Sequence, residues 1–226
     1  MDNVISFDGR RGPPPLPETR ITDALAEVRA YWDSLRDGRL VPLRADLDPR
    51  GIEGALPASF ILERVAPGQA RFRVAGQDLT GLVGSDVRGM PIGVLFTPAA
   101  RDAAAAALEA TFAGPEAVEL ALHAETGFGR PRLDGRMVLL PLRSDIGCIS
   151  RALGCLVTTG QTGRAPRRFD LSGVTRQALT GRGAGRSALS EALEMAGMTG
   201  LAEAPRPFTG APGPRLTLVH DAGRDR

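Results

Sequence analysis

The chain has 226 residues, of which 42% are hydrophobic, and this is enough for one globular domain with tails or for two small domains. All 28 basic residues are arginine, and because 26 residues are acidic, the net charge of +2 argues neither for nor against nucleic-acid binding. No apolar run is long enough to form the core of a signal peptide or to span a membrane, so we expect no membrane insertion and a cytoplasmic location. The two cysteines, Cys148 and Cys155, fit no zinc or redox spacing, and we expect both to be buried free thiols in a reducing compartment.

The N-terminal part of the chain changes character after residue 20. Residues 1–20 are polar and contain the run PPPLP, which cannot form a helix, so we predict a disordered proline-rich arm. Over 21–37, apolar residues recur at steps of three and four, which predicts an amphipathic helix that Thr22 caps and Gly38 ends. Its apolar stripe must be buried either against the sheet of its own domain or against the same helix in a second copy. The stripe, and with it the candidate dimer contact, consists of Leu25, Val28, Trp32 and Leu35.

Five β-strands and one further helix are predicted downstream. The first two strands form a hairpin, because Pro67 and Gly68 stand between them, and Phe72 and Val74 are expected on one face of the second strand. The helix begins after Thr97 as its cap and ends at a glycine. The later strands alternate or are continuously apolar, as expected for an antiparallel sheet with one covered face. The predicted strands are 59–65, 70–76, 118–126, 136–143 and 151–160, and the predicted helix is 97–114.

A glycine-rich stretch follows the second strand. Gly76 and Gly81 have the spacing of a phosphate-binding loop. Such a loop needs a lysine directly after its second glycine, but the apolar Leu82 and Val83 stand there. The stretch is therefore interpreted as a structural corner, in which Gly76 turns the chain out of the sheet with a positive φ angle.

The C-terminal segment 161–226 differs from the rest of the chain in composition. It is rich in arginine, glycine and proline, and only 187–198 has a helical pattern, so we predict a mostly disordered tail. Its arginines could contact acidic partners or RNA, but because they are not interleaved with aromatic residues, nucleic-acid binding is not the favoured hypothesis. The sequence thus predicts one folded unit over 21–160 between two disordered tails.

Residues that could support catalysis are few. The chain has only two histidines, His123 in a strand and His220 in the tail, and no Ser-His-Asp, Cys-His or metalloprotease spacing occurs. His123 is out of phase with the apolar residues of its strand, so we expect it to face solvent. We therefore predict no catalytic residue, no metal ligand and no bound cofactor.

The order of these elements, together with several motifs, resembles one protein family. The stretch RFRVAGQDLTGLVGSDVRGMPIGVLF at 71–96 is similar to an alphaproteobacterial PAS subfamily, in which a strand runs into an R-x-A-G corner and then a G-x-D-x-x-G segment. Upstream, YWDSLRDGRLVPLRADLDPRGIEGALP resembles the lead-in of that subfamily, and downstream, LLPLRSDIGCISRALGCLV resembles its final two strands. The resemblance covers about residues 21–160. The central motif is carried by Arg73, Ala75, Gly76, Gly84, Asp86, Gly89, Leu95 and Phe96.

This resemblance implies an α+β fold: a five-stranded antiparallel sheet with short helices on one face, preceded by the amphipathic helix. It also implies a non-enzymatic, stand-alone sensory or protein-interaction module of bacterial signal transduction. Such a module would form a homodimer and dock onto a signalling protein such as a histidine kinase or a scaffold.

Two other functions are open alternatives: binding of nucleic acid or an acidic partner through the C-terminal tail, and catalysis at an unrecognised site. Any small-molecule ligand in the interior would have to be largely apolar, because the residues expected to point inward are apolar. These pocket candidates, for which core packing is the simpler interpretation, are Phe72, Val74, Leu79, Leu95, Phe96, Leu108, Leu120, Leu122 and Leu139.

Overall fold

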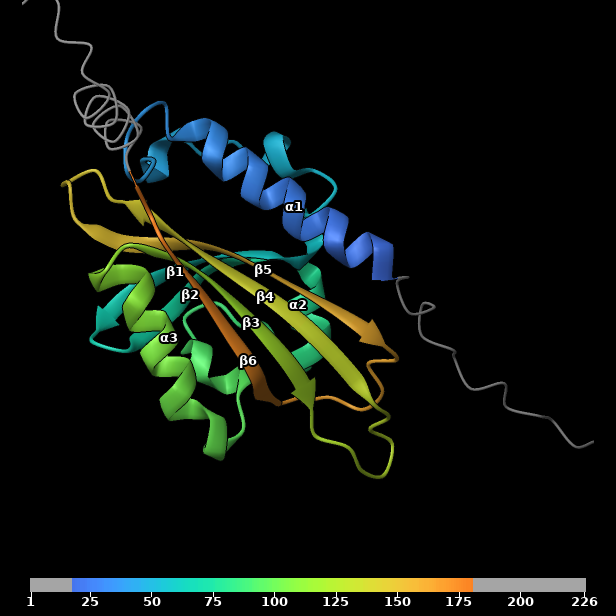
Figure 1. Ribbon diagram of the computed structural model, residues 1–226. Helices are drawn as coiled ribbons and strands as arrows, with labels where there is room; N and C mark the ends of the chain where they lie inside the picture. The colour runs from blue at the N-terminus through green and yellow to red at the C-terminus, as the bar shows by residue number, and fades with distance from the viewer. Residues whose placement is uncertain (1–17, 181–226) are drawn as a thin grey trace, which may run out of the picture. The chain divides into compact units, whose positions relative to one another are not determined.

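The structure, a computed structural model, describes residues 18–180, which form an α+β fold around one antiparallel sheet (Figure 1). The sheet has six strands in the order β2-β1-β5-β4-β3-β6. The strands are β1 (Ser59–Ala66), β2 (Gln69–Ala75), β3 (Glu116–Ala124), β4 (Leu133–Arg143), β5 (Ile149–Gly160) and β6 (Phe169–Ala178). The helices are α1 (Glu18–Leu35), α2 (Gln77–Val83) and α3 (Arg101–Ala113). Short 3₁₀ turns are η1 (Arg44–Asp46), η2 (Pro49–Ile52), η3 (Leu56–Ala58), η4 (Ile92–Leu95) and η5 (Pro98–Ala100).

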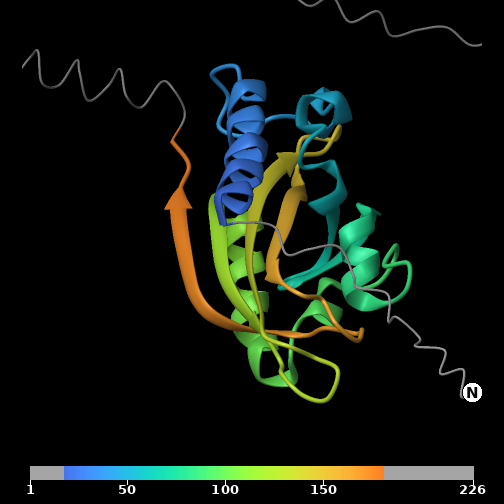
Figure 2. The same ribbon diagram turned by 90° about the vertical axis from the view of Figure 1, so that its right-hand side faces the viewer.

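Helices cover both faces of the sheet, and each face has its own buried cluster. The short helices α2 and α3 lie on one face and α1 lies on the other, as the two views show (Figures 1 and 2). The α3-side core includes Phe60, Leu62, Phe72, Leu79, Leu95, Phe96, Leu108, Leu120, Leu122, Met137, Leu139, Leu156 and Phe169. The α1-side core includes Leu25, Val28, Trp32, Ile52, Ile61, Val138, Leu140, Leu142, Leu153, Cys155 and Val157. The central strands are continuously apolar because their successive side chains enter the two cores in turn.

The predicted fold class is confirmed, but the predicted number of strands is wrong. All five predicted strands are present, with bounds that differ from the prediction by a few residues. The sixth, β6, lies within 161–226, which the sequence assigned to a mostly disordered tail, and it pairs with β3 along its whole length. The folded unit therefore continues to residue 180 instead of ending at 160, whereas residues 1–17 and 181–226, which hold most of both predicted tails, lie outside the described part of the chain.

The crossing from β5 to β6 is held by one buried arginine. Arg167 is 1% exposed, and its guanidinium donates hydrogen bonds to the carbonyls of Glu125 (3.1 Å), Pro131 (2.8 Å) and Thr162. Its backbone N–H donates to the carbonyl of Leu82 (2.7 Å). The guanidinium thus satisfies three backbone acceptors of the loops around it, which is how this polar crossing can be ordered.

The helix α3 follows the predicted pattern closely. Thr97 caps the preceding turn η5, since its side chain accepts a hydrogen bond from the N–H of Ala100 at 3.3 Å, and Pro98 occupies the first position of that turn. The buried face of α3 consists largely of small residues, among them Ala104 and Ala107. Small side chains allow the helix to lie close to the sheet, so the α3-side core needs few large residues from the helix itself.

The corner at Gly76 is present, but its predicted φ angle is wrong. Gly76 has φ −71° and ψ 166°, an extended conformation that any residue can adopt. A Cβ atom at this position would lie 2.1 Å from the carbonyl oxygen of Pro57 in η3, so the glycine is required by close approach of two backbone segments. The left-handed position is Gly84, which has φ +85° and ends α2.

The start of α1 also differs from the prediction. The helix begins at Glu18, so Thr22 lies inside the helix and does not cap it. The end agrees with the sequence: α1 stops at Leu35, and Gly38 has φ +80° in the turn that follows.

Candidate functional site

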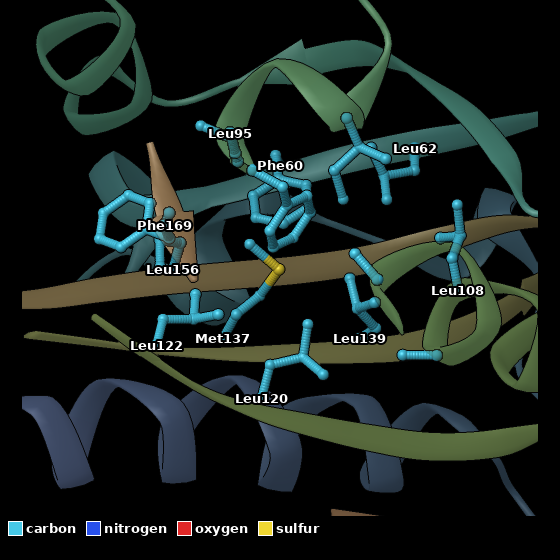
Figure 3. Packing of buried hydrophobic residues seen from close by; sticks show 14 of the residues in the cluster. Phe60, Leu62, Leu95, Leu108, Leu120, Leu122, Met137, Leu139, Leu156 and Phe169 are labelled. Carbon is cyan, nitrogen blue, oxygen red and sulfur yellow. The ribbon is translucent and has the colours of Figure 1, made fainter. Parts of the chain in front are cut away.

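The residues predicted to line a ligand pocket meet in the α3-side core. Figure 3 labels Leu95, Leu108, Leu120, Leu122 and Leu139, which point toward one another from the sheet and from the segments that cover it. All but one of the nine candidates are at most 3% exposed and belong to this core. The eight are Phe72, Leu79, Leu95, Phe96, Leu108, Leu120, Leu122 and Leu139. For Phe72, Leu120, Leu122 and Leu139, which lie on strands, sequence phase identified the interior side of the sheet.

Aromatic side chains occupy the centre of this interior. The rings of Phe60 and Phe72 meet edge to face, with centroids 5.4 Å apart and an interplanar angle of 73°. Gly154 on β5 makes room for them, because a Cβ there would lie 2.2 Å from the Phe60 ring. These residues pack as a hydrophobic core, and a ligand could enter only where their side chains move apart.

Val74 is the exception, and the prediction that it points inward is wrong. It is 52% exposed, because β2 contains a bulge: Ile61 pairs with Val74, but the next residue of β1, Leu62, pairs with Phe72. The extra residue, Arg73, breaks the alternation, so Val74 and Phe72 face opposite sides of the sheet although they are two residues apart. The sequence carries no clear signal for this bulge.

The apolar stripe of α1 is buried against the protein's own sheet. Leu25, Val28 and Trp32 are 8%, 0% and 1% exposed in the α1-side core, and the Trp32 indole N–H donates a hydrogen bond to the carbonyl of Pro141 on β4 at 2.8 Å. Only Leu35 is half-buried. Of the two alternatives for this stripe, packing within the domain is therefore the one that occurs. The prediction that these residues form a dimer contact is wrong, because the sheet already covers most of the stripe.

The two edges of the sheet differ in how they are covered. The outer edge of β2 is bonded to the segment before η4: Phe72 N–H donates to the Met90 carbonyl (3.0 Å), and Gly89 N–H donates to the Phe72 carbonyl (2.8 Å). At the other edge, Phe169 accepts a hydrogen bond from Thr97 N–H (3.0 Å) at the start of β6. Beyond that point, Ser172–Ala178 are exposed, and within residues 18–180 their backbone has no ladder other than the one with β3. β6, orange in Figure 2, lies at this open margin of the sheet beside β3.

A polar contact fastens the start of β6 to the α3 side. The Thr97 hydroxyl donates to the carboxylate of Asp170, and Nε2 of His123 lies 4.0 Å from the other oxygen of that carboxylate. The His123 side chain is 51% exposed, as its position in β3 predicted. The imidazole is not placed between the hydroxyl and the carboxylate, so the three groups do not have the arrangement of a nucleophile activated by a histidine base.

The two thiols have different surroundings. Cys155 is buried on β5, and burial raises the pKa of its thiol to about 12, so it is protonated at neutral pH. Cys148 is exposed in the turn between β4 and β5, so the prediction that both thiols are buried is wrong for this residue. Within 18–180, no three His, Cys, Asp or Glu side chains are grouped so that they could hold a metal ion.

The helices of the described part of the chain, residues 18–180, include none with both the length and the hydropathy that a membrane crossing requires.

A known family matches the greater part of the folded region. A family model described as PAS domain matches residues 21–157, which is more than half of the chain, and the chain therefore belongs to the PAS domain family. PAS domains are in general sensory modules of signal transduction without enzymatic activity, and they often mediate contacts between proteins. β6 lies after the matched residues. Comparison with curated proteins finds no match, and comparison with solved structures finds none either.

Proposed function

We propose that this chain is a non-enzymatic sensory and protein-interaction module of bacterial signal transduction, and that it works as a homodimer joined through the open edge of β6. The observation that supports this proposal is the edge itself, because unpaired N–H and C=O groups of an edge strand are a template for a strand from another chain. The sheet buries the α1 stripe, which favours β6 over α1 as the contact in the proposed dimer. The dimer would then dock onto a signalling protein such as a histidine kinase or a scaffold.

A second copy fits this edge better than an arbitrary strand. Two β6 strands that pair in antiparallel orientation are related by a twofold axis, which is the commonest symmetry of protein dimers. Such a dimer needs no strand other than β6 itself, because each copy supplies the same exposed edge.

The start of β6 offers a route from the interior to this edge. Phe169, the first residue of β6, is completely buried in the α3-side core, and its carbonyl is bonded to Thr97 next to α3. A rearrangement of the α3-side core would therefore move the strand that forms the dimer. This coupling is the sensory step of the proposal, because it links the interior to the surface through contiguous packed residues.

The proposal is tested by sedimentation velocity of the full chain over a range of concentrations. We expect the parent protein to form dimers, and we expect the substitution Val174→Lys to weaken the dimer at least about tenfold, because lysine on an edge strand opposes strand addition. Val65→Lys is the matched control, since Val65 is similarly exposed (50% against 44% for Val174) but lies on β1, which has neighbours on both sides.

Three results would contradict the proposal, and the third concerns the control variant. One is a parent protein that sediments as a monomer at every concentration. Another is a Val174→Lys variant that dimerises as tightly as the parent protein. If Val65→Lys weakens the dimer as much as Val174→Lys, the contact lies elsewhere than at β6.

A further inference from the structure

A hollow of about 370 Å³ lies on the α1-side face of the sheet, in a place that α1 does not reach. Its floor consists of residues from β1, β2 and β5, and its walls come from η1 and from the turn between β4 and β5, with no residue from α1. Two backbone contacts hold the η1 wall in place: Arg143 N–H donates to the carbonyl of Pro42 at 2.9 Å, and Leu43 forms a bridge with Arg143. The hollow is therefore a fixed feature of the fold.

Three arginines line this hollow, and two of them already have a carboxylate partner. Glu63 on β1 forms ion pairs with both Arg73 and Arg151. Arg44 is half-buried, and within residues 18–180 no carboxylate lies within ion-pair distance of its guanidinium. The other carboxylate of the lining, Asp145, is exposed in the β4–β5 turn. Three guanidinium groups thus face two carboxylates, which leaves one positive charge in excess.

The two ion pairs of Glu63 persist at neutral pH. Burial is the largest single influence on the pKa of Glu63 and raises it, but the hydrogen bonds and charges of Arg151 and Arg73 together outweigh burial. The pKa therefore lies below its ordinary value, and Glu63 is ionised. The ion pairs with Glu63 orient the guanidiniums of Arg73 and Arg151. The N–H donors that Glu63 does not use remain available for a ligand in the hollow.

One side of the hollow is apolar. Ile61 and Val74 are neighbours across the β1–β2 ladder, and both line the hollow together with Ala45 of η1. The bulge at Arg73 creates this wall, because it turns Val74 away from the α3-side core and places it beside Ile61. A half-exposed valine next to three guanidinium groups is suited to a ligand that carries an apolar portion beside its charge.

From this arrangement we infer that the hollow binds a small organic anion, in which a phosphate or carboxylate group is joined to an apolar portion. Guanidinium groups bind both kinds of oxyanion through paired N–H donors, and Arg44 supplies the charge that the protein does not neutralise itself. The volume lies in the range of pockets for small metabolites and is too large for a lone phosphate ion. The site is separate from the α3-side core and does not depend on β6.

The alternative is a purely structural network, in which the arginines serve only to neutralise Glu63. Two guanidiniums are already in contact with that carboxylate, so the network accounts for Arg73 and Arg151. It does not account for Arg44, which lines the hollow from a different segment, η1. Substitution of Arg44 therefore separates the two explanations.

The inference is tested by NMR titration of the full chain with three probes: phenyl phosphate, benzoate and inorganic phosphate. We expect phenyl phosphate or benzoate to shift amide signals around the hollow and to bind more tightly than inorganic phosphate, because only the aromatic probes can also cover Val74. The aromatic probe that binds more tightly identifies the anionic group.

The substitution Arg44→Gln should weaken binding of that probe about tenfold, the loss expected for one charge-assisted hydrogen bond. Arg132→Gln, an exposed arginine paired with Asp134, is the matched control and should leave binding unchanged.

A second variant makes the result independent of any effect of Arg44 on folding. Val74→Asp places a negative charge on the apolar wall at an exposed position, and it should abolish binding of both aromatic probes. The inference is overturned if no probe binds at millimolar concentration, or if Arg44→Gln binds like the parent protein. It is equally overturned if inorganic phosphate binds as tightly as phenyl phosphate, since the hollow would then hold an adventitious ion only.

Discussion

At the scale of single residues, Gly84 and Gly76 are both required to be glycine, but for different physical reasons. Gly84 ends α2 in a left-handed conformation that other residues adopt only with strain. Gly76 has an ordinary backbone conformation, and it is required because the carbonyl of Pro57 occupies the place of a side chain. Its N–H also donates to the Ser59 carbonyl at 2.8 Å, so the corner is bonded on one side and in steric contact on the other.

This account predicts that Gly76→Ala destabilises the domain by about 1–3 kcal/mol, because the added methyl group cannot fit without movement of η3 or β2. The control is Gly81→Ala within α2, where no atom lies within 4 Å of the added Cβ. That variant should be more stable than the parent protein by about 0.5–1 kcal/mol, since alanine favours a helix over glycine. Urea denaturation followed by circular dichroism measures both changes. If Gly76→Ala has the stability of the parent protein, the close approach to Pro57 is not a constraint.

At the scale of elements, β6 joins the fold through its first residues and leaves the rest of its length exposed. Phe169 is 0% exposed in the α3-side core, Leu171 packs partly against that core, and the following residues face solvent. Arg167 fixes the chain immediately before the strand. β6 is therefore anchored at one end by packing and along its length by hydrogen bonds to β3.

Phe169→Ala should lower the free energy of unfolding by about 3–5 kcal/mol, because it removes a fully buried aromatic side chain and leaves a cavity in the core. Val174→Ala, in the exposed part of the same strand, should change stability by no more than about 0.5 kcal/mol. Chemical denaturation of the two variants and the parent protein gives both values. A Phe169→Ala variant as stable as the parent protein would mean that β6 contributes nothing to the fold of the preceding strands.

At the scale of the whole described molecule, one sheet is shared by two cores. Residues of a single strand alternate between them, as Ile61 and Leu62 do on β1. If the sheet comes apart, both cores therefore lose the surface on which they are packed. The helix α1, which Trp32 attaches to the sheet, is part of this shared structure, so we do not expect it to detach alone.

We accordingly expect a single cooperative unfolding transition. Trp32 is the only tryptophan of the chain, and its fluorescence reports whether α1 is packed on the sheet. Its emission should shift to longer wavelength at the same denaturant concentration at which the far-ultraviolet circular dichroism signal is lost. A fluorescence change that precedes the loss of circular dichroism would show that α1 detaches first. Its stripe would then be available for contact with a second copy after all.

The parts of the fold that the sequence predicted correctly depend on local patterns. The alternation of apolar residues placed five strands, Thr97 and Pro98 marked the start of the helical segment around α3, and the phase of His123 indicated an exposed side chain. Four of the pocket candidates, Phe72, Leu120, Leu122 and Leu139, lie in the α3-side core because a strand sends every second residue to the same face. The other four buried candidates come from α2, α3 and the segment around η4, which cover that face.

The sequence alone thus determined five of the six strands, the helices α1 and α3, much of the interior face of the sheet and, through its motifs, the family. Tertiary structure decided the rest, because each remaining feature depends on contacts between segments far apart in the chain. Pairing with β3 makes Phe169–Ala178 a strand although its pattern is polar, and packing on the sheet gives the α1 stripe its partner. The bulge that turns Val74 outward, and the meeting of Arg44, Arg73 and Arg151 around one hollow, likewise exist only once β1, β2 and β5 are side by side.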